Sequence, residues 1–257
     1  MLERYSDKMR ARSATLLVSL ESRLDRILQF WLLIAGFIAA ARIALSPPPT
    51  GGAPISTFAS YMLVVVAPFA STLLALRWFK DGHLQPQPTT RLARAGKWRT
   101  LTPFEAQRAP LYGTTGIMVS LMVGMMLNVP VRVAEYFAAM PPIPVDAPSW
   151  LSALHFAMTF DVVAFGSLYM IAFVAALRRV PLFPRLLAAI WIGDLAMQVF
   201  TAKLVVAAGP LPPAVASALE SMLEGNVKKV LISAGLWLPY LLLSKRVNVT
   251  FRHRVPA

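Results

Sequence analysis

The sequence predicts an all-α protein: a bundle of six transmembrane helices with both termini in the cytoplasm and a short amphipathic helix at the N-terminus. Composition is the first reason. Of 257 residues, 57% are hydrophobic and 14% are charged, against about 25% charged in an ordinary soluble domain. So few charged side chains cannot cover a soluble core of this size. The other two reasons are six long apolar stretches and an alternating distribution of Lys and Arg along the chain.

The six stretches are long enough to cross the hydrocarbon core, which takes about 20 residues per helix. All are read as helices, because an open strand edge cannot satisfy its hydrogen bonds in lipid. A further helix is predicted along the outer membrane face at 212–224, with a break at Gly225 and Asn226, where Asn226 can cap the following helix. The reason is that one helix over 213–245 would be ~50 Å long. The predicted spans are 28–46, 58–76, 111–139, 150–177, 186–207 and 226–243.

The basic residues orient these spans. Six Lys and Arg lie in 1–27, seven in 77–110, three in 178–185 and four after Ser244, whereas 47–57 and 140–149 contain none. The positive-inside rule therefore places both termini in the cytoplasm. The net charge of +13 is explained as an orientation signal and a match to anionic headgroups of the bilayer. No nucleic-acid recognition motif accompanies it, so nucleic acid is not a predicted partner.

Four parts follow from this map. Leu16, Leu20 and Leu24 recur at near-helical spacing, which predicts an amphipathic helix at the cytoplasmic surface. The predicted parts are a cytoplasmic amphipathic segment at 1–27, two additional transmembrane helices at 28–79, a basic cytoplasmic loop at 80–110 and a four-helix transmembrane domain at 111–257.

Several classes of chemistry find no support in the sequence. The chain has no cysteine, which excludes disulfides, thiolate metal sites and a cysteine nucleophile. Its three histidines are scattered, and only His155 falls in a predicted span. There is no G-x-S-x-G, H-E-x-x-H or P-loop motif. We therefore expect no metal, no cofactor and no enzymatic activity.

Charged side chains inside the predicted spans are the strongest functional signal. Each costs about 2.5–3.5 kcal/mol at mid-membrane, so it should face the bundle and find a partner or line water. Asp161 and Asp194 lie near the middle of their spans, and Arg132 has five guanidinium donors to satisfy. We predict that Arg132 bonds one of these two acids. The polar residues predicted to line a common space are Asn128, Arg132, Glu135, His155, Asp161, Asp194, Gln198, Lys203 and Lys228.

Small residues near these charges suggest how the helices meet. Gly116, Ser120 and Gly124 recur at four-residue spacing on the face of the third span that carries Arg132. A ridge of small residues lets two membrane helices approach closely. We therefore predict close helix packing along this ridge.

Two interpretations of the charges remain open. They are internal structural pairs, with Glu224 holding Lys228 and Lys203 reaching the surface, or they line an outward-facing, partly basic cavity. The cavity predicts a small permease or a lipid- or solute-handling protein, with Arg132, Asp161 and Asp194 converging on one water-accessible space. The alternative is an accessory or assembly subunit of a larger membrane complex, with some of these charges facing a membrane-protein partner.

The C-terminal third carries a motif. Trp237-Leu238-Pro239-Tyr240 is followed by Ser244-Lys245-Arg246-Val247 and by Thr250-Phe251, after an earlier Phe183-Pro184. This pattern resembles the YdgK-like family of bacterial inner-membrane proteins, a family of unknown function, over roughly 108–252. The matched residues are Phe183, Pro184, Trp237, Pro239, Tyr240, Ser244, Lys245, Arg246, Val247, Thr250 and Phe251.

The chain departs from the family pattern where that family usually has Gly-Gly-Trp-Leu, because Gly116-Ile117-Met118 stands there without the Trp. The first two spans also lie outside the resemblance. The resemblance implies a bacterial inner-membrane location and no assigned activity. Physically, the C-terminal motif is typical of a membrane exit, with Trp237 and Tyr240 near headgroups and Lys245 and Arg246 anchored at the cytoplasmic surface.

Overall fold

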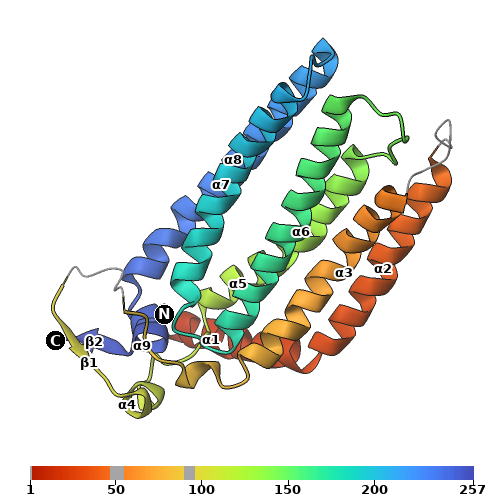
Figure 1. Ribbon diagram of the computed structural model, residues 1–257. Coiled ribbons are helices and arrows are strands. Elements are labelled where there is room, and N and C mark those ends of the chain that lie inside the picture. Colours follow the sequence, from red (N-terminus) through yellow and green to blue (C-terminus); the bar gives the residue numbers. More distant parts are fainter. Residues whose placement is uncertain (1, 47–54, 90–95) are drawn as a thin grey trace.

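The computed structural model describes residues 2–46, 55–89 and 96–257, and it confirms an all-α bundle (Figure 1). Most of the predicted outer connection at 47–57 and part of the basic loop at 80–110 lie outside these residues. The helices are α1 (Leu2–Ser22), α2 (Leu24–Leu45), α3 (Ile55–Trp78), α4 (Pro103–Arg108), α5 (Ile117–Ala139), α6 (Ser149–Leu177), α7 (Phe183–Ala207), α8 (Pro213–Leu243) and α9 (Lys245–Arg252), with a 3-10 turn at Gly82–Leu84 and strands β1 (Trp98–Thr100) and β2 (Arg254–Pro256).

Helices α2, α3, α5, α6 and α7 are long and apolar enough to cross a membrane, and α8 together with α9 forms a sixth candidate bent by 72°. Five of the predicted spans are therefore confirmed as membrane helices by length and composition, and the sixth is confirmed if α8 and α9 are counted as one bent span. Helix α5 begins at Ile117, six residues later than predicted. The reason is local: Gly113 and Gly116 adopt φ values of 106° and 76°, which a right-handed helix cannot contain.

The predicted break between an outer helix at 212–224 and the last span is wrong. Helix α8 runs without interruption from Pro213 to Leu243 and is ~46 Å long at 1.5 Å per residue. Gly225 is accommodated inside the helix, and the Asn226 amide donates to Gln198 of α7 instead of capping a new helix. Packing against α7 thus overrides the local break signal, and α8 extends beyond a 30 Å hydrocarbon core.

Helix α6 is the centre of the bundle. It packs against α3, α5 and α7, while α2 covers α3 and α8 covers α7, so the helices form a sheet-like array with α2 at one edge and α8 at the other (Figure 1). The apolar stretch of α6 is 67% buried, whereas that of α2 is 17% buried. Burial therefore falls from the centre outward, as expected when lipid covers the edges.

One end of the array carries both termini together with α1, α4 and α9, and we call it the basic end (Figure 1). Strand β1 pairs antiparallel with β2, which joins the loop at 96–108 to the C-terminus. The Arg254 guanidinium lies over the Trp98 ring, 4.5 Å from its centroid. A capping box between Thr102 and Glu105 begins α4. The Thr102 backbone N–H holds the pKa of the Glu105 carboxyl below its ordinary value.

Candidate polar cavity

Arg132 is the centre of the polar interior. Its Nη1 donates to Asp161 Oδ2 of α6 at 2.6 Å, and its Nη2 donates to Asp194 Oδ2 of α7 at 2.6 Å. The side chain is 14% exposed, and charge-assisted bonds of this length are the stronger kind. The prediction that Arg132 bonds an acid from another span is confirmed, and the structure supplies both acids instead of one.

The two carboxylates differ in how completely they are satisfied. Asp194 has no exposed surface, and its Oδ1 accepts from Gln198 while its Oδ2 accepts from Arg132 and from the Tyr169 hydroxyl. Asp161 is 6% exposed, and its Oδ1 has no hydrogen-bond partner among the described residues. Asp194 is thus a fully engaged buried acid, whereas Asp161 keeps one oxygen unused.

A chain of polar contacts links this centre to α8 and back to α5. Gln198, which donates to Asp194, accepts at its Oε1 from the Asn226 amide at 3.3 Å. Asn226 Oδ1 accepts from Lys229 Nζ at 3.5 Å, and Lys229 forms an ion pair with Glu135, one turn beyond Arg132 on α5. The contacts therefore form a closed ring through α5, α7 and α8, with α6 attached through Asp161.

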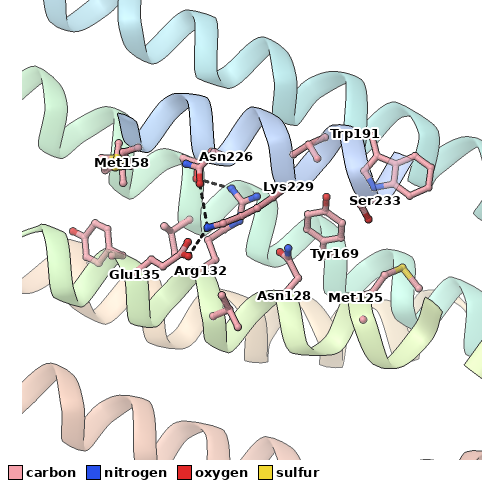
Figure 2. Close-up of a pocket in the computed structure, with 18 of the residues that line it drawn as sticks. Met125, Asn128, Arg132, Glu135, Met158, Tyr169, Trp191, Asn226, Lys229 and Ser233 are labelled. Atoms are coloured by element: carbon pink, nitrogen blue, oxygen red, sulfur yellow. Dashed lines mark hydrogen bonds and ion pairs between the residues drawn. The ribbon is translucent and has the colours of Figure 1, made fainter. Parts of the chain in front are cut away.

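This ring borders a cavity of about 630 Å³ between α5, α6, α7 and α8. Figure 2 shows the Arg132 and Glu135 side chains of α5 and the Asn226 and Lys229 side chains of α8 extending toward one another across it. The remaining wall is largely apolar and aromatic, as is usual for small-molecule sites. That part of the wall includes Leu121, Met125, Met158, Val162, Tyr169, Leu187, Trp191, Val230 and Trp237.

The predicted site residues divide into three groups. Asn128, Arg132, Glu135 and Asp161 line the cavity. Those that lie behind its wall or beside it are Asp194, Gln198 and His155. His155 is buried and its Nε2 lies 3.4 Å from the hydroxyl of Tyr136, a lining residue.

The remaining two predictions, Lys203 and Lys228, are wrong. Both side chains are exposed and neither lines the cavity. Lys228 pairs with Glu224 at 2.5 Å, as the structural interpretation predicted. One residue along a helix is a turn of about 100°, so Lys228 leaves the cavity while Lys229 enters it.

The predicted close packing at Gly124 is also wrong. A Cβ atom built on Gly124 of α5 or on Gly225 of α8 would meet no atom within 4 Å, and both glycines line the cavity. Ser120 is exposed, and Gly116 precedes α5. The small residues therefore leave space between α5 and α8 instead of drawing these helices together.

Sequence reasoning missed Asn226, Lys229, Ser233 and Trp237, which line the cavity from α8. Their spacings of three or four residues put them on one helix face. All four residues fall within the predicted span 226–243. Their shared helix face is therefore the signal in the sequence that could have found them.

The C-terminal motif proves to be mainly a packing unit. Phe251 is buried, and its ring lies 5.0 Å from that of Phe183, so the two matched segments of the motif touch. Thr250 Oγ1 accepts from Gly113 N–H at 3.0 Å, and Arg246 donates to Thr115 at 2.9 Å. The expected surface anchor is thus a short helix folded back against the loop before α5, and only Trp237 of the motif reaches the cavity.

The cavity offers ion pairs, hydrogen-bond acceptors and aromatic faces. Its ring contains two cationic side chains, Arg132 and Lys229, and three carboxylates, those of Glu135, Asp161 and Asp194, so its formal charge is −1. Asp194 lies behind the wall, and the charged side chains that line the cavity, Arg132, Lys229, Glu135 and Asp161, balance one another. The predicted partly basic lining is therefore corrected to a neutral one, backed by one further buried carboxylate. Comparison of the chain with family models, with curated protein sequences and with solved structures returned no match.

Proposed function

We propose that this chain is a small permease or a lipid- or solute-handling protein of a bacterial inner membrane, and that the cavity between α5 and α8 holds the polar part of what it handles. The observation that carries the proposal is the convergence of Arg132, Asp161 and Asp194 at the wall of one cavity of about 630 Å³. Intramembrane ionisable groups that face a cavity are typical of substrate or ion pathways.

The contacts around α8 support this proposal. Helix α8 packs on α7, and an exposed ion pair between Lys229 and Glu135 joins it to α5. Exposed pairs contribute about 0–1 kcal/mol. This weak link supports entry of an occupant between α5 and α8 without unpacking of the core.

The distribution of polarity supports an amphipathic occupant. The polar ring lies on one stretch of α5, at Asn128, Arg132 and Glu135, and the apolar wall at Leu121 and Met125 continues along the same helix toward the basic end. A headgroup at the ring would leave a hydrocarbon chain beside the apolar wall.

Lipid analysis of the purified protein tests the proposal. The double variant Gly124→Leu/Gly225→Leu fills open space and should lower the amount of co-purifying amphiphile, measured by mass spectrometry of extracted lipids, at least tenfold. Gly235→Leu is the matched control, because this α8 glycine also has open space around it and lies outside the cavity lining. Equal amphiphile content in all three folded proteins would overturn the proposal.

The accessory-subunit alternative rests on a different observation, the sparse cover of α2. Large apolar side chains such as Phe30, Leu33 and Phe37 are exposed on it, which suits lipid or another membrane protein. A stoichiometric partner whose binding is lost on replacing Phe37 by Ser, and is unaffected by filling the cavity, would favour this alternative.

Membership in the YdgK-like family and the N-in, C-in orientation are part of the same proposal. The contact between Phe183 and Phe251 supports the first, because it joins the two matched segments. The second is supported by the position of both termini at the basic end (Figure 1), which the positive-inside rule assigns to the cytoplasm.

A further inference from the structure

The polar ring is short of one positive charge. Arg132 is shared by two carboxylates, and Lys229 is already matched by Glu135. Uncompensated charge in a region of low dielectric constant is expensive, so such sites bind a counter-charge or a proton. The ring therefore favours a positively charged occupant over the anionic one that a basic lining would suit.

The shortfall is localised at the cavity wall. Asp194 lies behind Arg132 and is bonded to Arg132 and Gln198 inside the protein, whereas Asp161 lines the cavity and its buried Oδ1 has no partner among the described residues. One helical turn before Arg132, the buried Oδ1 of Asn128 is likewise unpartnered and Asn128 also lines the cavity. A carboxylate oxygen can only accept a hydrogen bond, so the missing group must donate one.

Aromatic rings in the cavity wall also favour a positively charged occupant. Tyr169, Trp191 and Trp237 all line the cavity, and Figure 2 draws Tyr169 and Trp191 among the side chains around it. Aromatic faces attract organic cations within about 6 Å of the ring centroid. Mg²⁺ or Ca²⁺ would need six or more oxygen ligands, and Asp161 offers a single free carboxylate oxygen.

We propose that the cavity binds a primary alkylammonium group, whose N–H donors occupy the free oxygen of Asp161 and whose hydrocarbon part lies along Leu121, Met125 and Leu187. This inference rests on the proposed function, because it names the substrate class of the same cavity. The ammonium belongs to the headgroup of an amine-bearing lipid or to a free long-chain amine. Both sources present the same donor to Asp161.

The test uses the full chain in phosphatidylcholine nanodiscs, titrated with decylammonium at neutral pH. Binding is followed by the fluorescence of Trp191 and Trp237 and by calorimetry, with empty nanodiscs as the reference for partition into lipid. Decylammonium should bind at least about tenfold more tightly than decyltrimethylammonium, which has no N–H donor, and than decanoate, because a charge-assisted hydrogen bond is worth that factor or more. Equal binding of the three compounds would overturn the inference.

Two matched variants test whether decylammonium binding depends on the Asp161 carboxylate. Asp161→Asn removes the accepting carboxylate and leaves Arg132 and Asp194 as a one-to-one pair, so the fold should persist while decylammonium affinity falls at least about tenfold. Glu224→Gln removes the same charge from an exposed pair outside the cavity and should leave the affinity unchanged. Wild-type affinity in Asp161→Asn would overturn the inference.

Two further experiments distinguish an amine-bearing lipid from a free amine and provide a second variant in case Asp161→Asn does not fold. Replacing phosphatidylcholine by phosphatidylethanolamine should weaken decylammonium binding by competition if the natural source is lipid, and should not if it is a free amine. If Asp161→Asn fails to fold, Gly225→Leu takes its place, and unchanged decylammonium binding there overturns the inference. Loss of co-purifying amphiphile on filling the cavity, without any decylammonium binding, would overturn this inference and leave the proposed function standing.

Discussion

Helix α5 has a hollow on each side, and the two hollows contrast in chemistry. On one face, Asn128, Arg132 and Glu135 border the polar cavity toward α8. On the other, Val129 and Val133 border a groove of about 460 Å³ toward α2 and α3, in which none of the lining side chains that the structure describes is ionisable. Neighbouring residues on one helix thus serve two environments, separated by the turn of about 100° per residue.

The contrast shows what each side requires from the rest of the fold. Ring contacts and hydrogen bonds hold the groove side. Tyr61 stacks on Phe137 at 5.4 Å and its hydroxyl donates to the Met140 carbonyl at 2.7 Å, while Trp31 donates to the Val65 carbonyl at 2.9 Å. Lipid can cover such a surface without further partners. The cavity side needs acids from α6 and α7 to hold Arg132, because an unpaired charge cannot remain there.

The largest expected effect separates these requirements. Arg132→Leu leaves Asp161 and Asp194 facing each other without a cation and should lower the free energy of unfolding by about 3–5 kcal/mol. Equilibrium unfolding in detergent micelles measures it. The triple variant Arg132→Leu/Asp161→Asn/Asp194→Asn removes every charge and should recover most of the loss. A single variant as stable as the wild type would contradict the picture of a charge-dependent cavity side.

A smaller effect is expected on the groove side. Tyr61→Phe keeps the ring and removes the hydroxyl that bonds the Met140 carbonyl, so it should cost about 1 kcal/mol in the same unfolding assay. Phe160→Leu, an exposed position on α6, is the control and should change stability by less than about 0.5 kcal/mol. A loss for Tyr61→Phe as large as that for Arg132→Leu would remove the distinction between the two sides.

The smallest change in stability is expected for a substitution at the rim of the cavity. Its main effect should be on the distance between α5 and α8. Lys229→Met breaks an exposed pair and should cost less than about 1 kcal/mol, yet it removes the ionic link between α5 and α8. Spin labels on cysteines at Ala139 and Ser221, in a chain with no other cysteine, should report a broader distance distribution.

Lys228→Met provides the matched control for the rim. It breaks an ion pair of similar exposure within α8 itself, so the distance distribution should stay as in the wild type. Identical distributions for Lys229→Met and Lys228→Met would mean that the Lys229–Glu135 contact does not hold the cavity closed.

Sequence reasoning was successful wherever the signal is local. The apolar runs that form α2, α3, α6 and α7 gave boundaries within four residues of those observed, because the length of a membrane helix is set by the bilayer. The requirement that Arg132 find an acid was also predictable, since five guanidinium donors in an apolar span have few partners to choose from. These features need only the sequence and the properties of lipid.

Tertiary structure decided the rest. It assigned both Asp161 and Asp194 to Arg132, paired Glu135 with Lys229 on α8, and kept α8 continuous through Gly225. Which side chains meet between two helices depends on how the helices are rotated and tilted relative to each other. A shift of one residue along a helix moves a side chain by about 100° around the helix axis. The sequence by itself therefore determined that there is a membrane bundle with a charged interior, whereas the contacts of α8 with α7 and α5 decided that this interior is an open cavity with one unmatched carboxylate oxygen.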